Sequence, residues 1–166
     1  MIIALSGKMG TGKSTLTNYL MSKAKKPVVV KIAGPLYELQ NMIYNHLDLK
    51  LEGEKDRPLL IALGMWARDK DENFWTNIAI NKAKKLSETH DLVLIDDCRF
   101  KNEGKAFDEI GMLIRIDGVQ RGSNLNPEAM NHPSETDLDD YPFKYRVNNS
   151  ISVEDTIEQL NKILTN

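Results

Sequence analysis

The sequence predicts an α/β fold in which a parallel sheet of five strands is covered by helices. Short apolar runs rich in β-branched residues alternate with longer helix-forming stretches, which is typical of doubly wound sheets. The first apolar run also leads through a glycine-rich loop directly into a helix-forming stretch, and this is the order of elements in a phosphate-binding unit. Both observations place the chain in the α/β class.

The elements follow one another in a regular order. The expected strands are 1–6, 28–33, 92–95, 112–116 and 145–147. Their nearly uninterrupted apolar character predicts parallel strands that are buried on both faces. The expected helices include 13–25, 74–87 and an amphipathic closing helix 153–164, for which Ser152 is the expected N-cap.

Two stretches fall outside this alternation. Residues 34–75 have a mostly helical pattern, broken by the charged sequence LEGEKDRP around Arg57, and we interpret them as a helical insert. Residues 118–142 are rich in Asn, Pro, Ser and Asp and are longer than an ordinary connection, which favours a lid. The remaining segments, 1–33, 76–117 and 143–166, would form the core of one domain.

The bulk properties exclude several classes of function. A chain of 166 residues with 41% hydrophobic content can bury one core. Its net charge of -2 argues against a nucleic-acid polymer as partner. Cys98 is the only cysteine, so no internal disulfide can form, and the three histidines are too scattered for a zinc cluster. Because no apolar run approaches the roughly 20 residues of a membrane span, we expect a cytoplasmic protein that does not associate with membranes.

The glycine-rich loop carries the strongest chemical signal. Residues 7–14 read GKMGTGKS, which matches the P-loop pattern, and they lie between an expected strand and an expected helix as that motif requires. In such a loop the backbone N–H groups surround a phosphate, Lys13 reaches the β- and γ-phosphates, and the hydroxyl of Ser14 coordinates Mg²⁺. The residues expected to bind ATP are Gly7, Met9, Gly10, Thr11, Gly12, Lys13, Ser14, Thr15 and Asn149.

A pair of acids follows the third expected strand. The sequence LVLIDD ends in Asp96 and Asp97, at the position where P-loop enzymes place the aspartate that holds the metal or its water. We assign the metal to Ser14 and Asp96, although the sequence leaves open which of the two acids serves it. The other acid would then cap the following helix.

The arginines are few and unevenly placed. The chain has six arginines against 16 lysines. Four of the six, Arg57, Arg68, Arg99 and Arg121, fall in the insert, just beyond the acidic pair, or at the start of the lid. A guanidinium group binds two oxygens of a phosphate at once and stays charged. This placement therefore predicts a second phosphate opposite the P-loop. Arg115 and Arg146 are instead expected in surface salt bridges.

The motifs together resemble the phage-type deoxynucleoside monophosphate kinases. The resemblance rests on GKMGTGKS, RPLLIALGMWARDKDENFW, IDDCRFKNE, HPSE and YPFKYRVNN, and it spans most of the chain. It implies a three-layer P-loop NTPase sandwich with a helical monophosphate-binding insert and a lid. The implied reaction moves the γ-phosphoryl group of ATP onto a deoxynucleoside monophosphate in the presence of Mg²⁺.

The resemblance also implies roles for single residues. The implied catalytic residues are Lys13, Asp97 and Arg99, to which the placement of the arginines adds Arg121, and the implied substrate-binding residues are Arg57, Arg68, Trp75, Asp97, Arg99 and Glu103. Trp75 either stacks on a nucleobase or belongs to the core. His132, Ser134 and Glu135 match the family's HxSE stretch, whose plain interpretation is a hydrogen bond that anchors the lid. Met65 and Lys144 depart from the family's pattern, which leaves the base preference open.

Two other classes of function remain open at this stage. A related P-loop kinase acting on a small metabolite, such as dephospho-coenzyme A or phosphomevalonate, would share the P-loop and the general layout. A nucleotide-binding switch without an acceptor would share only the P-loop, and the placement of the arginines argues against it. Whether the chain forms a homodimer also stays open.

Overall fold

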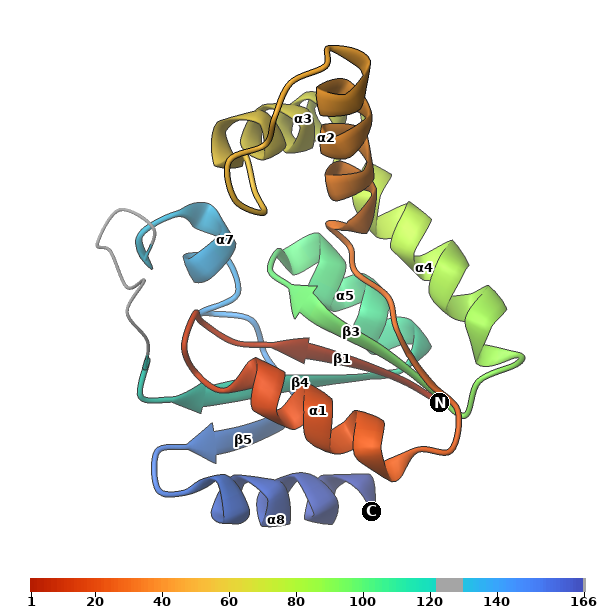
Figure 1. The fold of residues 1–166 in the computed structure, drawn as a ribbon. Coiled ribbons are helices and arrows are strands. Elements are labelled where there is room, and N and C mark those ends of the chain that lie inside the picture. The colour runs from red at the N-terminus through yellow and green to blue at the C-terminus, as the bar shows by residue number, and fades with distance from the viewer. Residues whose placement is uncertain (122–129, 166) are drawn as a thin grey trace.

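The computed structural model describes residues 1–121 and 130–165, and it contains one parallel sheet of five strands. The strands lie in the order β2, β3, β1, β4, β5. Figure 1 labels the last four of them. Their bounds are β1 Ile2–Ser6, β2 Pro27–Val29, β3 Leu92–Cys98, β4 Met112–Gly118 and β5 Tyr145–Asn149. The α/β class and the five parallel strands predicted from the sequence are therefore confirmed.

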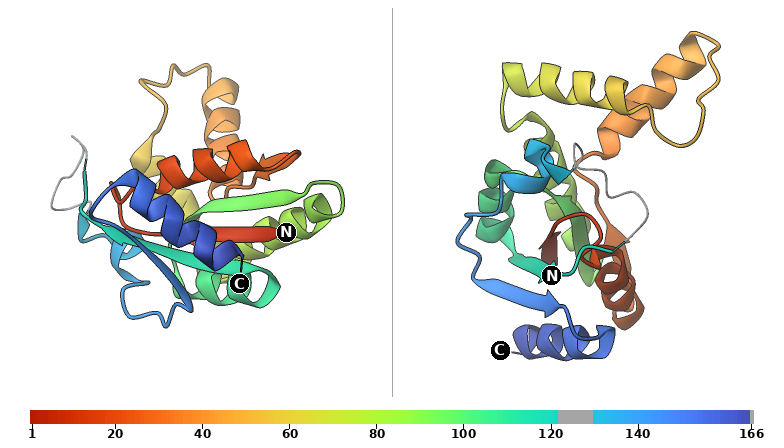
Figure 2. Two further views of the ribbon diagram at one scale, coloured as in Figure 1. Left: turned by 90° about the horizontal axis from the view of Figure 1, so that it is seen from below. Right: turned by 90° about the vertical axis from the view of Figure 1, so that its left-hand side faces the viewer.

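Helices cover both faces of this sheet. Their bounds are α1 Lys13–Lys23, α2 Gly34–His46, α3 Arg57–Lys70, α4 Phe74–Ser87, α5 Lys101–Ile110, α7 Pro133–Thr136 and α8 Val153–Leu164. Helices α1 and α8 pack on one face and α4 and α5 on the other, whereas α2 and α3 project beyond the body of the sheet (Figures 1 and 2).

The two faces of the sheet build two separate hydrophobic cores. Alternate residues of a strand point to opposite faces, so Ile3 and Leu5 of β1 join the core under α1 and α8, while Ile2 and Ala4 join the other core. Because both faces are covered, strands β1, β3 and β4 can be apolar along nearly their whole length. The three-layer arrangement predicted from the sequence follows from this burial.

The second strand is shorter than the prediction of 28–33. Strand β2 ends at Val29, and the backbone N–H groups of Ile32 and Ala33 donate to the carboxylate of Asp97 at 2.9 and 3.0 Å. Because these two N–H groups bind a side chain and not a neighbouring strand, the backbone leaves the sheet before α2. The apolar sequence of this segment does not reveal such an acceptor.

The insert contains two helices, as its pattern predicted, but its charged loop ends earlier than expected. Helix α3 begins at Arg57, and Asp56 caps it by accepting a hydrogen bond from the backbone N–H of Leu59 at 3.1 Å. Pro58 fits in the first turn because its missing N–H has no partner there. The capping role predicted for Ser152 at the start of α8 is confirmed, since its hydroxyl accepts from the N–H of Asp155.

The predicted lid, 118–142, lies partly outside the described residues, because 122–129 are not among them. The described part after the gap contains α7 and a turn that leads to β5. Within residues 1–121 and 130–165, none of the helices has the length and apolar character that crossing a membrane requires.

Candidate active site

The P-loop connects β1 to α1 at the carboxyl edge of the sheet. Gly10 and Gly12 have φ angles of 79° and 98°, which side chains other than glycine rarely adopt. A Cβ atom on Gly10 would lie 2.3 Å from the backbone oxygen of Arg121, and one on Gly12 would lie 2.2 Å from the amide nitrogen of Asn149. The glycines are therefore required both by the turn and by the segments packed against it.

Lys13 is folded back onto the loop that precedes it. Its Nζ atom donates to the carbonyl oxygens of Gly7 at 2.5 Å and Lys8 at 2.8 Å. Burial, followed by the neighbouring charge of Arg99, lowers the pKa of Lys13 from 10.5 to about 7, and the charge of Glu135 opposes this shift. The ammonium group is thus a desolvated cation at the position where the motif places the β- and γ-phosphates.

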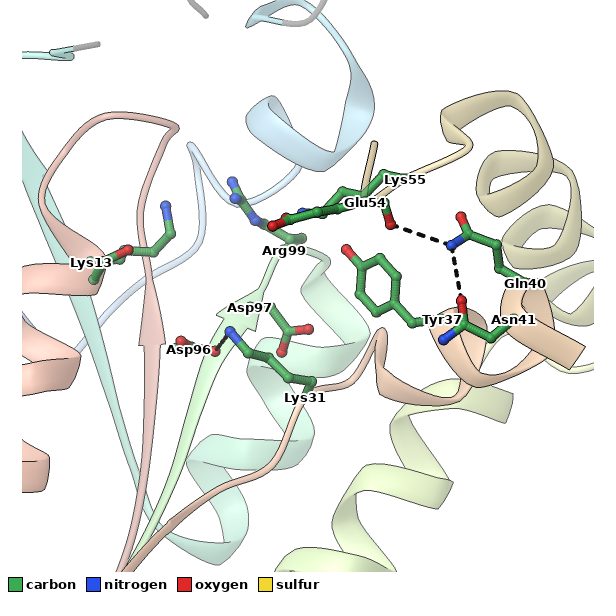
Figure 3. A pocket seen from close by; sticks show the side chains of 11 residues that line it. Lys13, Lys31, Tyr37, Gln40, Asn41, Glu54, Lys55, Asp96, Asp97 and Arg99 are labelled. Carbon is green, nitrogen blue, oxygen red and sulfur yellow. Dashed lines mark hydrogen bonds and ion pairs between the residues drawn. The ribbon is translucent and has the colours of Figure 1, made fainter. Parts of the chain in front are cut away.

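A polar cavity of about 570 Å³ opens beside the P-loop (Figure 3). Lys13 lies on one side of it and Tyr37 and Gln40 of α2 on the other, with Asp97 and Arg99 between them. The cavity is lined by Lys13, Ser14, Lys31, Tyr37, Gln40, Asn41, Glu54, Lys55, Asp96, Asp97 and Arg99. We call this space the polar cavity.

The two acids at the end of β3 differ in their surroundings. Asp96 lies with Oδ1 2.5 Å from Nζ of Lys31, so a cation already neutralises it. Both oxygens of Asp97 accept backbone N–H groups, and burial raises the pKa of this carboxyl above its ordinary value against those two hydrogen bonds. Asp97 therefore fixes the backbone that leads into α2. Asp96 is paired only with a lysine ammonium, which another cation could replace.

The oxygen donors in the polar cavity fit Mg²⁺. The hydroxyl of Ser14 and the carboxylate of Asp96 both line it, and oxygen ligands from a few side chains are what Mg²⁺ takes when phosphates and water complete its shell. The ammonium of Lys31 beside Asp96 shows that this position favours a positive charge. The described residues contain no group of three or more His, Cys, Asp or Glu side chains that could hold a metal without such help.

A second cavity, of about 450 Å³, is mostly apolar. Its walls come from the loop after β2, from helices α2, α3 and α4, and from the segments at the starts of α5 and α7. The lining residues are Ile32, Ala33, Leu36, Tyr37, Leu60, Ile61, Gly64, Met65, Arg68, Trp75, Asp97, Arg99, Phe100, Glu103, His132, Pro133 and Ser134. We call this space the apolar cavity, and Tyr37, Asp97 and Arg99 line both cavities.

A buried acid organises one wall of the apolar cavity. Glu103 is 2% exposed and accepts the backbone N–H groups of Arg99 and Phe100 at 2.7 and 3.1 Å. Burial raises the pKa of Glu103 from 4.5 to about 7, against those hydrogen bonds. Arg68 lies 3.6 Å from the same carboxylate and stacks over the ring of Phe100, so its guanidinium is held at the cavity by two contacts.

The structure brings several residues proposed from the sequence to one place. Lys13, Ser14, Asp96, Asp97 and Arg99 line the polar cavity. Arg68, Trp75, Asp97, Arg99 and Glu103 line the apolar one. Residues from five separate segments of the chain therefore meet around two adjoining spaces.

Other proposed residues lie elsewhere. Arg57 is exposed and lines a separate hollow beside the loop that precedes α3. Asn149 is buried, where it donates to the carbonyl of Thr11 at 2.9 Å and accepts from Thr156, so its amide supports the P-loop from behind. The backbone N–H of Arg121 donates to Gly10 O at 3.0 Å, while its side chain is exposed and belongs to neither cavity lining.

Two of the singled-out residues, Trp75 and Arg115, are buried. Trp75 is 3% exposed, and its indole N–H donates to the carbonyl of Gly64 at 3.2 Å. This burial agrees with the core interpretation of Trp75. Arg146 forms the expected exposed ion pair with Asp117. Arg115 also forms salt bridges, with Asp117 and Asp139, but it is 6% exposed, so only its expected surface position was wrong.

The site also contains Lys31, for which no role was predicted, and Glu135, which was predicted only to anchor the lid. Lys31 lines the polar cavity, and Glu135 contacts both the P-loop and Arg99. A lysine directly after an apolar run was an available signal for Lys31. The HPSE motif drew attention to Glu135 but gave no hint of its partners, which are distant in the sequence.

Comparison with known proteins locates the fold. No protein-family model matches the chain. Over 144 residues it is 33% identical to an uncharacterized protein, ORF77, of Ictalurid herpesvirus 1 (strain Auburn). The match covers 84% of this chain and 59% of the viral protein, so the chain spans about three-fifths of that relative's length.

Solved structures resemble the whole chain at low sequence identity. TT1252 from Thermus thermophilus has a TM-score of 0.61 at 20% identity, with 99% of this chain and 96% of that one covered. Shikimate kinase from Acinetobacter baumannii, in complex with shikimate, has a TM-score of 0.56 at 12% identity, with 99% and 93% covered. Dephospho-CoA kinase from Campylobacter jejuni has 0.55 at 18%, with 99% and 95% covered. The chain thus shares its α/β fold with these proteins.

Proposed function

We propose that this protein is an ATP-dependent kinase that transfers the γ-phosphoryl group of ATP to the phosphate of a deoxynucleoside monophosphate, giving ADP and a deoxynucleoside diphosphate. One observation carries the proposal: a charged cavity at the P-loop and an apolar cavity large enough for a nucleobase share Asp97 and Arg99. A donor and an acceptor bound in these two spaces would meet at those residues.

The donor side would act through charge. Backbone N–H groups of the P-loop and the ammonium of Lys13 would bind the phosphates of ATP, and Ser14 and Asp96 would hold Mg²⁺. When bound, Mg²⁺ would neutralise charge on the phosphate oxygens. Lys31, which now pairs with Asp96, would then be free to turn towards an incoming phosphate, because its side chain is half exposed.

The acceptor side would act through shape and a few polar groups. Leu36, Met65, Trp75 and Phe100 give the apolar cavity walls that suit a flat heteroaromatic base. Arg68 and Arg99 would hold the acceptor phosphate near the P-loop, since each guanidinium group can donate two N–H bonds to oxygens of one phosphate. Such a pocket is poorly matched to a small polyol, which needs polar walls all round.

A phosphate acceptor would also need no general base from the protein. A phosphate monoester is largely dianionic at neutral pH and can attack in line without losing a proton to the protein. An alcohol acceptor, as in the small-metabolite alternative, would need a base to take its proton. Asp97 is a carboxylate that lines both cavities, and both of its oxygens already accept backbone N–H groups.

The test is an assay of ADP formation with Mg²⁺–ATP and a panel of acceptors. The panel holds the deoxynucleoside monophosphates, their ribose counterparts, dephospho-coenzyme A and phosphomevalonate. We expect ADP release that depends on at least one deoxynucleoside monophosphate. Phosphoryl transfer to one of the two metabolites alone would support the alternative kinase. Slow ATP hydrolysis at a rate that no acceptor changes would support a nucleotide switch.

A further inference from the structure

Glu135 is a buried carboxylate that joins three segments of the chain. It is 7% exposed, and its Oε2 atom accepts the backbone N–H of Met9 in the P-loop at 2.6 Å. Its Oε1 atom accepts from Nη1 of Arg99, also at 2.6 Å. Both contacts are short and charge-assisted, and the P-loop lies more than a hundred residues away in the sequence.

The contact with Glu135 occupies only one nitrogen, Nη1, of the Arg99 guanidinium. Nη1 donates to Glu135 and, at 3.2 Å, to the carbonyl of Gly7. Nη2 and Nε of Arg99 donate to no acceptor in residues 1–121 and 130–165. Because Arg99 lines both cavities, the open edge of its planar fork is available to a phosphate between them.

The segment that carries Glu135 is itself firmly attached. Leu138 is 2% exposed and belongs to the hydrophobic core under α4 and α5. Asp139 lies 2.6 Å from Nζ of Lys8 in the P-loop and 3.0 Å from Nη2 of Arg115. With an apolar anchor and further ion pairs beside it, Glu135 is held in place and does not resemble a mobile surface acid.

We propose that Glu135 is a positioning residue that acts through Arg99. Its carboxylate holds the guanidinium so that Nη2 and Nε face the acceptor phosphate between the two cavities, and it ties this orientation to the P-loop at Met9. The inference rests on the proposed function. It also gives the HPSE stretch a role in aligning the two halves of the site, because catalytic groups gain most when a second set of residues fixes their orientation.

The first experiment compares Glu135→Gln with Asp140→Asn. Asp140 lies on the same segment and loses the same charge, but its ion pair with Lys101 is exposed and contacts neither cavity. We expect Glu135→Gln to lower kcat at least about tenfold, with KM for ATP changed less than about threefold, since the effect is on orientation and less on binding. Asp140→Asn should keep normal kcat. Normal kcat in Glu135→Gln would overturn the inference.

A double-mutant cycle separates positioning from simple support of the fold. If Glu135 acts through Arg99, adding Glu135→Gln to Arg99→Lys should cost less than about threefold more in kcat. A purely structural role would give the full loss of Glu135→Gln again in the Arg99→Lys background, and that result would reject the inference. Melting temperatures of all variants show whether each protein is folded.

A spectroscopic arm distinguishes failure of this inference from failure of the proposed function. In the nucleotide-free protein, the side-chain NMR resonances of Arg99 and the backbone amide of Met9 should move in Glu135→Gln and stay in place in Asp140→Asn. If no acceptor is phosphorylated, the proposed function fails whatever the spectra show. If transfer occurs but the Arg99 and Met9 resonances are the same in Glu135→Gln as in the wild type, only the role of Glu135 fails.

Discussion

The polar and apolar cavities are built in different ways. The P-loop side of the polar cavity is organised by backbone, with glycines of positive φ, the first turn of α1 and the end of β3 placing Lys13, Ser14 and Asp96. The apolar cavity is organised by side chains that come from α2, α3, α4, α5 and the segment around α7. The P-loop side of the polar cavity therefore depends on a short local motif, whereas the apolar cavity depends on how distant helices pack.

This difference predicts how each side tolerates change. A loop set by backbone geometry loses its function when one special residue is altered, because no neighbour can replace it. A pocket formed by many apolar side chains shares its binding energy among them, so single substitutions there have modest effects. The predictions below run from the polar cavity to the apolar one.

The largest expected effect is at Lys13. Lys13→Met removes the only ammonium that donates to the P-loop carbonyls of Gly7 and Lys8 within the described chain, and with it the charge that the proposed function places at the phosphates of ATP. We expect kcat to fall by about a thousandfold, in line with the loss of a transition-state contact of about 4 kcal/mol. Steady-state kinetics with Mg²⁺–ATP and the best acceptor measure this.

Lys8 offers a matched control in the same loop. Its Nζ atom points to Asp139, at 2.6 Å. Lys8→Met should lower kcat less than about tenfold, since an exposed ion pair contributes little. Equal losses in the two variants would show that the loop is damaged by any change and that Lys13 has no special position.

The next effect is at Arg99, where the two cavities meet. Arg99→Lys keeps the charge but loses the planar fork, so we expect kcat to fall by about a hundredfold, or about 3 kcal/mol. The exposed Lys84 of α4 is the control, and Lys84→Arg should leave kcat unchanged. Near-normal turnover of Arg99→Lys would remove Arg99 from the site.

The pH dependence of ATP binding tests the state of Lys13. Its pKa of about 7 in the free protein lies below the ordinary value of 10.5, so the ammonium form is lost as the pH rises through about 7. ATP needs that ammonium, and its Kd should therefore weaken by up to about tenfold per pH unit above pH 7, with proton uptake on binding. Calorimetry in buffers of different ionisation enthalpy measures both quantities.

Raising the pH above 7 weakens ATP binding but, through the same lysine, stabilises the folded protein. Between pH 7 and 10.5 the unfolded chain binds the Lys13 proton more tightly than the folded protein does, so this group makes the free energy of unfolding rise with pH.

Glu103 also has a pKa of about 7, so its titration could be mistaken for that of Lys13 in the ATP-binding experiment. Glu103→Gln should leave the pH dependence of ATP binding intact, and its disappearance in that variant would assign the titration to Glu103.

The smallest effect is expected in the apolar cavity. Met65 lines it and is 59% exposed, so Met65→Ala should raise KM for the acceptor about fivefold, or about 1 kcal/mol, without changing KM for ATP. Met42 on α2 is 66% exposed and lies outside both cavity linings, which makes Met42→Ala the control. A change in KM for ATP alone would place the acceptor elsewhere.

The same contrast explains which parts of the structure could be read from the sequence. The P-loop, the five strands and the closing helix with its Ser152 cap were predictable because they depend on local patterns. The end of β2 was not, because it depends on Asp97, more than sixty residues further along the chain. The clustering of Arg68 with Glu103 and the burial of Arg115 likewise depend on packing between distant elements.

Arg57 and Glu135 illustrate the limits of motif reasoning. Both stand in motifs that suggested a site, yet Arg57 starts a helix beside a separate hollow, whereas Glu135 reaches the P-loop. Their sequence neighbourhoods do not distinguish these outcomes, because the direction of a side chain depends on the partner it finds across the fold.

Binding of a bisubstrate compound tests the central claim most directly, since that claim is that two nucleotides bind in adjoining cavities that meet at Arg99. In such a compound, adenosine and a deoxynucleoside are joined through a phosphate chain. We predict that one equivalent displaces both ATP and the monophosphate, and that it binds at least about a hundredfold more tightly than either. Affinity no better than that of ATP, with the monophosphate still able to bind alongside, would contradict the account.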